Sequence, residues 1–428
     1  PYIEKMLEGE QNILWHSPIT WFAKSSGTTS EKSKFIPVST ESLDDGHFKS
    51  SKDVLALYYR NFPQSTIFSG KSLVLGGSHQ INQLNKDSFY GDLSAVMLQN
   101  MSLIPTLIST PDLSIALMEE WDEKIEKMAE ATMQEDVTFI AGVPTWTIVL
   151  INKILEKTGK TDLHDVWPNL ELYIHGGVNF TPYQQQFQRF FASKSINYLE
   201  TYNASEGFFA AQDVIGRDGM LLFLDHGIFY EFMPLDEDGK EFPNTLLLNE
   251  VIIGVNYALI ITTNSGLWRY KIGDTIAFVS TNPYRIKVTG RLKHFINAFG
   301  EEVIIENADM AITKAASQFG VNVKDYTVAP IYFGDASNGT HQWLIECDIN
   351  DADKKDFIIA LDENLKTLNS DYEAKRFKDM AMRLPEIIFV PQNTFYNWLK
   401  SKGKLGGQHK VPRLSNDRKI IEEVLAVI

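Results

Sequence analysis

The sequence contains one cysteine, Cys347, in 428 residues. A single thiol cannot form a disulfide within the chain, and it cannot supply the cysteine pairs of a structural zinc site. The nine histidines show no helical ligand spacing, since the closest two, His164 and His175, are eleven residues apart. We therefore expect neither a disulfide framework nor a histidine-rich metal site, and a reducing, cytoplasmic setting is the default.

Long apolar runs and an excess of positive charge are also missing. No stretch approaches the roughly 18 apolar residues of a membrane span, and no signal-peptide pattern is visible. Forty Lys and Arg residues against 55 Asp and Glu residues give a net charge of −15. This balance predicts no nucleic-acid partner and no membrane partner bound by bulk charge, although a local basic site for a phosphorylated cofactor remains open.

The composition that remains is that of a globular protein, with 44% hydrophobic and 22% charged residues. The first two-thirds of the chain alternates short apolar runs with helical segments, which favours a mostly parallel sheet covered by helices. One helix is expected after Thr110 and Pro111, with an apolar stripe from Leu113 to Met128. The apolar runs that we expect to be strands are 71–77, 138–144, 170–178 and 195–202.

The pattern changes near residue 220. Alternating strands divided by short turns, within 221–234, 245–263 and 267–280, predict an antiparallel, β-barrel-like part. After Gly290 a helix (306–318), a hairpin near residue 338 and a charged helix (352–368) predict a small α+β domain. The expected fold is thus α/β, with a large N-terminal domain (1–292) and a small C-terminal domain (293–428). Because the chain begins at Pro1, we also expect an N-terminal segment to be missing.

The segment from Ser25 to Lys34 gathers hydroxyl residues around Gly27, with a lysine at its end. Backbone N–H groups, hydroxyls and one cation suit a polyphosphate. The segment is not a Walker A loop, which needs GxxxxGK[ST] after a strand. An ordinary solvated Ser/Thr loop has the same composition.

A second motif, Thr201 to Gly207, follows a predicted strand, and open α/β sheets bind ligands at the carboxyl ends of their strands. Tyr202 would pack on a base, Ser205 would donate to a phosphate, and Glu206 would hold Mg²⁺. The rival interpretation is a hydrolase nucleophile elbow at Ser205. That motif is GxSxG, and Asn203 replaces its first glycine.

Three further motifs follow in order. In Gly266 to Ile276, Asp274 is suited to two ribose hydroxyls, although Gly-Asp is more often a plain turn; Arg269 or Lys271 would face phosphate or a buried acid. The segment 289–303 suits a flexible joint at the domain boundary. The segment 403–414 places Lys410 in a glycine-rich loop, where a basic residue is commonly just solvated.

The order of these motifs resembles that of the acyl-adenylate-forming superfamily, which includes firefly luciferase and acyl-CoA ligases. Within it the chain is similar, over essentially its whole length, to the Gretchen Hagen (auxin-responsive promoter) family of acyl acid amido synthetases, in a bacterial type. The three nucleotide motifs of that family are matched by Ser25 to Thr29 with Lys34, by Tyr202 to Glu206, and by Tyr270 to Asp274.

The resemblance implies a two-step ligase that uses ATP and Mg²⁺. A small carboxylic acid is adenylated with release of pyrophosphate, and an amino acid amine then takes the acyl group and releases AMP. The small domain would rotate about the joint at 290–300 between the steps. The resemblance assigns the β- and γ-phosphates to the first loop, Ser25, Ser26, Gly27, Thr28, Thr29 and Lys34.

The remaining roles are implied in the same way. The adenine and α-phosphate would contact Tyr202, Ala204 and Ser205, and the superfamily's adenine-side loop is matched by Gly176 and Gly177. Glu206 would bind the metal and Asp274 the ribose. Arg291 would lie at the joint, and Lys410 would contact the α-phosphate. The catalytic residues implied in this way are Lys410, Glu206 and Ser205. Residues 142–146 would form a wall of the acyl pocket, or only a strand–loop–helix start.

Two positions depart from the plant members of the family. Lys271 stands where they carry arginine, and lysine makes no planar bidentate contact. The plant members also carry a lysine at the joint, and residues 299–302 of this chain do not include one. Both departures leave the plant hormone substrates open. Thioester formation with coenzyme A and an inactive sensor that holds ATP or an acyl-adenylate are the alternatives to amide formation.

Overall fold

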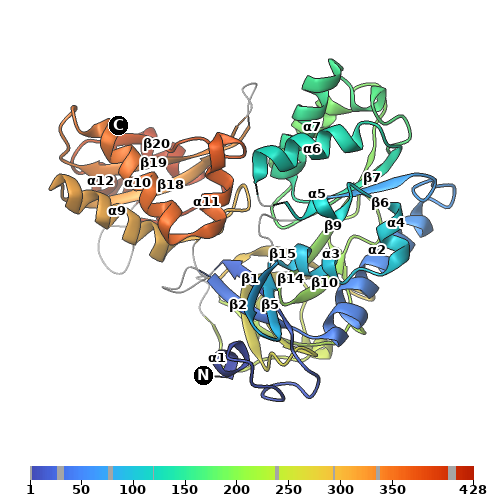
Figure 1. The fold of residues 1–428 in the computed structure, drawn as a ribbon. Helices are drawn as coiled ribbons and strands as arrows, with labels where there is room; N and C mark the ends of the chain where they lie inside the picture. The colour runs from blue at the N-terminus through green and yellow to red at the C-terminus, as the bar shows by residue number, and fades with distance from the viewer. Residues whose placement is uncertain are drawn as a thin grey trace. The chain divides into compact units, whose positions relative to one another are not determined.

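A computed structural model of the chain describes residues 2–26, 33–75, 81–118, 120–236, 241–292, 295–333, 338–402 and 411–428. The chain divides into two compact units (Figure 1). The first unit comprises Pro1–Ser25 and Phe35–Leu292, and the second comprises Ser26–Lys34 and Lys293–Ile428. Each unit is described by itself below.

The first unit is built on one eleven-stranded sheet with the order β12-β13-β14-β15-β11-β10-β9-β8-β7-β3-β6. One half is parallel, as the strand–helix alternation predicts. Most side chains of its strands β7 (Val137–Ala141) and β8 (Leu172–Gly176) are buried. Its strands are β6 (Ser109–Thr110), β3 (Lys71–Val74), β7 (Val137–Ala141), β8 (Leu172–Gly176) and β9 (Asn197–Ala204).

The other half of the sheet is antiparallel, which confirms the change of pattern near residue 220. It is not a separate layer, because β9 and β10 pair with each other and join the two halves. Among the described residues the sheet does not close into a barrel, because β12 and β6 are its two edge strands. The strands are β10 (Gly207–Ala211), β11 (Met220–Leu222), β12 (Ile228–Pro234), β13 (Asn256–Thr263), β14 (Tyr270–Thr281) and β15 (Tyr284–Arg291).

Apolar side chains from this antiparallel half form a core of their own. Phe209, Phe232, Tyr257 and Phe278 are fully buried in it. The ring centroids of Phe232, Tyr257 and Phe278 lie 5.0 to 6.1 Å from one another. Burial of this much aromatic surface stabilises this half of the sheet. The antiparallel half is therefore a rigid support for whatever side chains its strands carry.

The main helices of the first unit carry the connections of the parallel half, and α6 and α7 lie side by side (Figure 1). The longest is α7, whose first residue is Pro144 and which ends at Gly159 in the left-handed conformation, as proline and glycine favour. The helices are α1 (Tyr2–Leu7), η1 (Ser42–Phe48, a π-helix), α2 (Lys49–Asn61), α3 (Leu93–Gln99), α4 (Leu103–Ile108), α5 (Leu113–Ala116), α6 (Trp121–Thr132), α7 (Pro144–Thr158), η2 (Leu163–Asp165), η3 (Thr181–Tyr183), α8 (Gln184–Phe190) and η4 (Leu248–Glu250).

The prediction of one helix from residue 113 to 128 is wrong. The chain forms α5, leaves the helical conformation at Leu117, and begins α6 at Trp121. Thr110 is not the cap, because it belongs to β6 and pairs with Leu73; the N-cap is Asp112. Pairing with the sheet edge thus overrides the local capping pattern.

A four-stranded sheet, in the order β2-β1-β5-β4, belongs for the most part to the first unit. Its strands β1 and β5 are parallel, and β5 pairs antiparallel with β4. Buried Ala23, Ile36, Val38 and Val96 pack in the core that it shares with α3. The strands are β1 (Trp21–Ser26), β2 (Ser33–Val38), β4 (Asn82–Asn85) and β5 (Ser88–Gly91).

The second unit is α+β, as its sequence predicts. A sheet of β18 (Val323–Ile331), β19 (Thr340–Cys347) and β20 (Glu386–Val390) pairs antiparallel and then parallel, and Figure 1 shows its helices packed around it. A short hairpin, β16 (Phe295–Ile296) with β17 (Val303–Ile304), precedes it. The helices are α9 (Ile305–Phe319), α10 (Lys354–Leu368), α11 (Ser370–Arg376), η5 (Phe377–Asp379), α12 (Thr394–Ser401) and α13 (Lys419–Leu425).

Candidate functional site

The candidate site lies where the large sheet changes from parallel to antiparallel pairing. Strand β9 pairs parallel with β8 and antiparallel with β10. Tyr202 and Ala204 lie within β9, and Ser205 and Glu206 form the turn that joins β9 to β10. The expected loop is therefore a two-residue turn, which holds Ser205 and Glu206 on rigid strands on both sides.

Asp274 lies in a bulge of β14 and not in a turn between strands. Ala258 pairs with Thr275 and Ile260 with Lys271, so β14 advances four residues while β13 advances two. Gly273 has a φ of +97°, a conformation that glycine adopts without strain. A bulge re-aims the side chains around it, and here Asp274 becomes the register partner of Arg291 in β15.

The carboxylate of Asp274 accepts two hydrogen bonds. The Tyr202 hydroxyl donates to Oδ2 at 2.6 Å, and Nε of Arg291 donates to Oδ1 at 2.7 Å. The Asp274 side chain is only 9% exposed. Burial, and then the charge of Asp274, raise the pKa of Tyr202 well above its ordinary value, so that its hydroxyl stays protonated as a donor.

Glu206 is the second carboxylate of the site, and Tyr270 is its partner. The two side chains share a hydrogen bond, and burial followed by the charge of Glu206 raises the pKa of Tyr270. Arg291 is close enough to lower the pKa of both tyrosines. The site therefore has two carboxylates, each bound to a tyrosine, and Arg291 is bound to one of them, Asp274. The sequence prediction named the Tyr270 motif but gave Tyr270 itself no role.

The fit of Mg²⁺ to this site depends on Glu206. Among the described residues no group of three or more His, Cys, Asp or Glu side chains is arranged to hold a metal ion. Mg²⁺ is commonly bound by one or two carboxylates together with substrate phosphates and water. A single carboxylate at the turn after β9 fits that mode of binding.

Gly176 is the last residue of β8, and Gly177 follows it. A Cβ at Gly176 would lie 2.6 Å from the carbonyl oxygen of Thr201, its register partner on β9, and Gly177 has a φ of +79°. Only glycine permits this close approach of the two strands. The pair therefore lies next to Tyr202 at the same edge of the sheet.

The other predicted residues lie elsewhere. Ser25 and Ser26 end β1, and Lys34 is the second residue of β2. Gly27, Thr28, Thr29 and Lys410 lie outside the described residues. Val143 and Pro144 are the N-cap and first residue of α7, so the segment 142–146 has the local structure of a strand–loop–helix start.

Arg269 faces a mostly buried acid, Glu231, whose side chain is 12% exposed, and Lys271 faces the more exposed Glu241. Arg269 pairs with Glu231 at 2.9 Å, and Lys271 with Glu241 at 2.6 Å. All four side chains are between one-eighth and two-thirds exposed. Neither pair includes Asp274 or Glu206, whereas Arg291 binds Asp274.

A Ser–His–Asp chain of hydrogen bonds lies apart from the cluster. The hydroxyl of Ser50 is 2.7 Å from Nδ1 of His226, and Nε2 of His226 is 2.9 Å from Asp53. Burial lowers the pKa of His226, so the neutral ring accepts from Ser50 and donates to Asp53. Ser50 is 0% exposed, and no substrate can reach its hydroxyl. The arrangement ties α2 to the loop before β12 and does not support a hydrolase.

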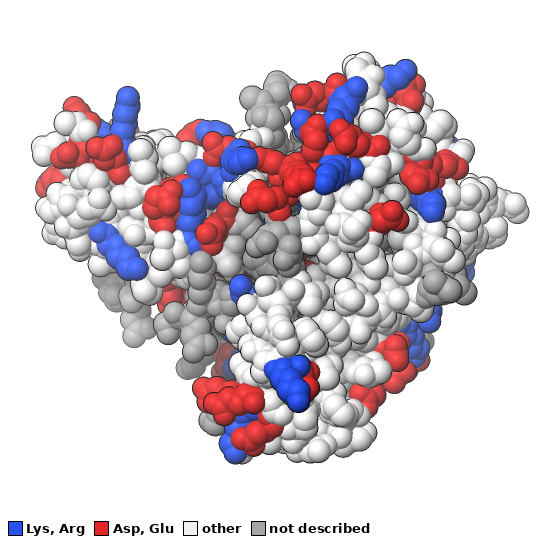
Figure 2. Space-filling model, in the orientation of Figure 1, with Lys and Arg blue, Asp and Glu red and all other residues white. Residues whose placement is uncertain are grey.

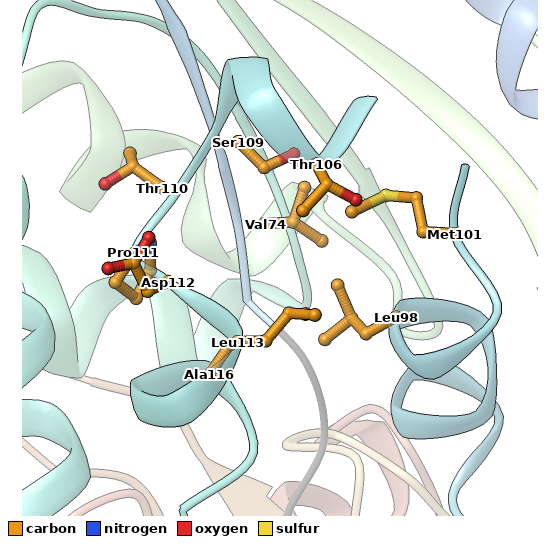
Figure 3. Close-up of a pocket in the computed structure, with 10 residues that line it drawn as sticks. All are labelled: Val74, Leu98, Met101, Thr106, Ser109, Thr110, Pro111, Asp112, Leu113 and Ala116. Atoms are coloured by element: carbon orange, nitrogen blue, oxygen red, sulfur yellow. The ribbon is translucent and has the colours of Figure 1, made fainter. Parts of the chain in front are cut away.

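A small pocket opens at the ends of β3 and β6, where Val74, Leu98 and Leu113 gather (Figure 3). Met101 adds to this apolar wall, and Asp112 is the one ionisable residue in the lining. The lining therefore offers no cation to a carboxylate, and its polar groups are the hydroxyls of Thr106, Ser109 and Thr110 with the Asp112 carboxylate.

Charges of both signs are intermixed over part of the face drawn in Figure 2. Figure 2 shows acidic and basic side chains side by side over the region of α6 and α7. There Lys153 and Lys157 both pair with Glu126, at 3.3 Å for Lys153. No helix of the described ranges is long and apolar enough to cross a membrane.

Three domain models of one family match the chain in order. The GH3 family N-terminal domain matches residues 1–196, the central domain matches 221–291, and the C-terminal domain matches 306–419. The central match ends at Arg291, and the C-terminal match lies wholly within the second unit.

Individual relatives agree with these matches. The chain is 21% identical to the 4-substituted benzoates-glutamate ligase GH3.12 of Arabidopsis thaliana, over 99% of the chain and 86% of the relative. It is 24% identical to the indole-3-acetic acid-amido synthetase GH3.4 of Arabidopsis thaliana, over 92% and 68%. The solved GH3.15 acyl acid amido synthetase shares its fold, with a TM-score of 0.59 at 18% identity, over 99% of this chain and 84% of that one.

Proposed function

The chain belongs to the GH3 family, and from that premise we propose that it is an ATP-dependent acyl acid amido synthetase. In the first step a carboxylate oxygen of a small acid attacks the α-phosphorus of ATP, and pyrophosphate leaves. In the second step the neutral amine of an amino acid attacks the activated carbonyl. AMP leaves, the amine loses a proton, and an amide remains.

The observation that carries the proposal is the bonding of Asp274. A carboxylate has about four lone-pair sites, and among the described residues only Tyr202 and Arg291 donate to this one. Acceptor capacity is therefore left for two ribose hydroxyls. Arg291 and Tyr202 hold the carboxylate in one orientation, so that the ribose would meet a preorganised acceptor.

The remaining residues of the cluster suit the rest of the nucleotide. The Gly176–Gly177 turn would admit the adenine ring next to Tyr202 and Ala204, and Ser205 would donate to the α-phosphate. Mg²⁺ held by Glu206 would offset charge on the phosphate oxygens. Around the β- and γ-phosphates we place Ser25, Ser26, Gly27, Thr28, Thr29 and Lys34.

The two units suggest how the two steps are separated. We propose that residues 1–292 bind ATP and the acid, and that residues 293–428 form a mobile domain. The division of the chain directly after Leu292, one residue beyond Arg291, supports this boundary, whereas the same division groups Ser26–Lys34 with the second unit. Rotation at this point would bring Lys410 to the α-phosphate for adenylation and remove it for transfer, in a site closed to water.

Mass spectrometry tests the proposal. The protein is incubated with ATP and Mg²⁺, pooled carboxylic acids and pooled amino acids. We expect acid-dependent AMP and a new mass equal to acid plus amino acid minus water. AMP without an amide would favour another acceptor such as coenzyme A. No AMP from a broad pool would contradict the ligase and favour a sensor.

The Lys410→Ala variant is a control for the same experiment. Loss of a cation that acts only in the transition state lowers a rate on the order of 10²–10³-fold. Acid-dependent AMP formation should fall by that amount while ATP binding is retained. Normal turnover would remove Lys410 from the mechanism.

A further inference from the structure

One face of the parallel half of the large sheet is covered by α2, whose buried side chains form a single stripe. Val54 and Tyr58 pack in one core with Leu199 of β9. The Tyr58 hydroxyl accepts from Asn197, the first residue of β9, at 2.8 Å. Ser50, one helical turn before Val54, is 0% exposed. The stripe therefore lies over the face of β9 that carries residues 197 and 199, and it runs from the start of that strand toward its carboxyl end.

His47 continues this stripe into the π-helix η1, three residues before Ser50, and is 2% exposed. Its position is fixed on both sides. Leu43 packs in a core against which Tyr270 also packs, and Ser50 bonds to His226. In addition, η1 packs against β10, the strand that follows the turn of the candidate site. The imidazole therefore lies over the covered face of the sheet, at the end of the cover that is nearest to this turn.

The ring of His47 is a buried hydrogen-bonding group without a partner. Among the described residues, no group bonds to its Nδ1. Burial lowers the pKa of His47 to about 4, so the ring is neutral near pH 7 and donates at one nitrogen while it accepts at the other. Buried polar atoms in proteins are nearly always paired, and π-helices are frequent at functional sites. These features indicate that His47 pairs with a ligand.

The cover of this face ends at Asn203. Side chains alternate along a strand, so Asn203 shares the α2 face of β9 with Leu199 and Thr201. Leu199 is 0% and Thr201 8% exposed, whereas Asn203 is exposed. Its Oδ1 lies 3.4 Å from the position that a Cβ would take at Gly176, so the glycine keeps this part of the sheet free of a side chain. The opening adjoins Ser205, where the proposed function places the α-phosphate.

We propose that His47 is a specificity-determining residue for the carboxylic acid, and that the preferred acids carry a hydroxyl substituent. A hydroxyl both donates and accepts, so it pairs with either tautomer of the ring. The Asn203 amide offers a second donor and acceptor at the opening. Tyr202, which is assigned to the nucleotide, projects from the opposite face of β9, so the two substrates would reach the turn from opposite sides. The inference rests on the proposed function, because it takes the acid to meet the α-phosphate at this turn.

The test compares matched acids in wild-type and variant proteins. Benzoate is compared with the three hydroxybenzoates, and butanoate with the hydroxybutanoates, by kcat/KM for acid-dependent pyrophosphate release. His47→Phe keeps a buried ring without hydrogen-bonding atoms, and His47→Gln keeps a donor and an acceptor. The control is His175→Phe. His175 is 5% exposed and its Nδ1 also lacks a partner among the described residues, but its ring stacks on Phe180 at 4.0 Å, on the opposite face of the sheet.

The wild type should prefer at least one hydroxy acid over its parent acid by roughly tenfold, since one hydrogen bond separates the two. In His47→Phe this ratio should approach one, mainly through a lower kcat/KM for the hydroxy acid, while the KM for ATP stays unchanged. His47→Gln should keep part of the preference. His175→Phe should keep the wild-type ratio.

Three results would overturn the inference. They are a wild type that prefers the parent acid in every pair, a His47→Phe variant that keeps the wild-type ratio, and an equal loss of the ratio in His175→Phe. If His47→Phe does not fold, His47→Gln carries the same test.

A wild type that releases no pyrophosphate with any acid contradicts the proposed function, and binding then decides on His47. The NMR signal of its ring is assigned by its absence from the spectrum of His47→Gln. A shift of this signal on addition of a hydroxy acid, and a smaller one with the parent acid, would support the inference. Equal shifts, or none, would overturn it.

Discussion

Among the described residues, each unit holds a buried aspartate that is bound by a tyrosine and an arginine, and the two aspartates differ in how many hydrogen bonds they can still accept. In the first unit Asp274 meets Tyr202 and Arg291. In the second unit Asp362 of α10 meets Tyr372 and Arg376 of α11. The residue types are the same, and both hydroxyls and both Nε atoms lie 2.6 to 2.7 Å from the carboxylate.

The carboxylate of Asp362 is saturated. Oδ1 accepts from the Tyr372 hydroxyl and from Nε of Arg376, and Oδ2 accepts from Nη2 of Arg376 at 3.1 Å and from Lys366 at 2.8 Å. The side chain is 2% exposed. Four donors occupy about four lone-pair sites, so no acceptor remains for a ligand and the cluster holds α10 to α11.

The contrast shows that burial and residue type alone do not mark a binding carboxylate. Asp274 accepts two bonds from the described residues, where Asp362 accepts four. Remaining acceptor capacity distinguishes a site that can take two hydroxyls from an ion pair that only supports the fold. The following substitutions test that distinction.

The largest expected effect is that of Asp362→Ala on stability. Removing one partner of a buried ion pair leaves the buried Arg376 with only the exposed Asp379 as a counter-ion, and breaking such a pair costs about 3–5 kcal/mol of unfolding free energy. Urea unfolding measures the loss. Asp379 also pairs with Arg376 but is 58% exposed, and Asp379→Ala should cost under about 1 kcal/mol. Equal losses in the two variants would contradict the structural role of Asp362.

Asp274→Asn is expected to affect the nucleotide. Hydrogen bonds to a charged group contribute about 1.5–3 kcal/mol, so AMP affinity should fall roughly tenfold to a hundredfold. Calorimetric titration with AMP measures this change. Asp362→Asn should leave AMP affinity unchanged at temperatures where it is folded. A larger loss of affinity in Asp362→Asn would reverse the comparison.

The two tyrosines sharpen the comparison further. Tyr372→Phe removes one donor from the saturated carboxylate and should lower the unfolding free energy by about 1.5–3 kcal/mol, with no effect on AMP binding. Tyr202→Phe leaves Asp274 held by Arg291 alone, and AMP affinity should fall several-fold. Paired unfolding and titration experiments on both variants give the result. If Tyr202→Phe altered stability alone, the orientation of Asp274 would not matter for the nucleotide.

The smallest effect concerns pH. Burial by itself raises the pKa of Asp362, but the hydrogen bonds and charges of Arg376 and Lys366 outweigh it and lower the pKa below 3.8. A folded-state pKa below the unfolded value means that the carboxylate stabilises the second unit above about pH 4. This contribution is lost as the pH falls through the folded-state pKa, by at most about 1.4 kcal/mol per pH unit. Acid unfolding should therefore be flatter in Asp362→Asn than in the wild type.

Much of the fold follows from local patterns in the sequence. The apolar runs that became β3, β7, β8 and β9 are long enough to be recognised without knowledge of their partners. The helix from residue 113 was wrong because Ser109 and Thr110 pair with β3, a partner nearly forty residues away. The antiparallel strands belong to the same sheet as the parallel strands because β9 pairs with β10. No periodicity in the sequence encodes this pairing.

The candidate site was predictable as a set of motifs but not as a geometry. Tyr202, Glu206 and Asp274 stand in motifs that the chain shares with a known family. The bond from Tyr202 to Asp274 spans 72 residues, and it depends on a bulge that alternation along β14 does not reveal. Glu206 with Tyr270 was missed for the same reason. The roles given to Lys410 and to the Ser25–Lys34 segment stay predictions.

The bulge in β14 makes chain length a determinant of the site in its own right. Side chains along a strand alternate between two faces, so deleting one residue beside Gly273 would turn Asp274 away from Tyr202 and Arg291 while every chemical group stayed in the chain. A substitution removes one contact, whereas such a deletion removes both at once. This stretch of β14 should therefore accept changes of residue more readily than changes of length, which is the opposite of what surface loops accept.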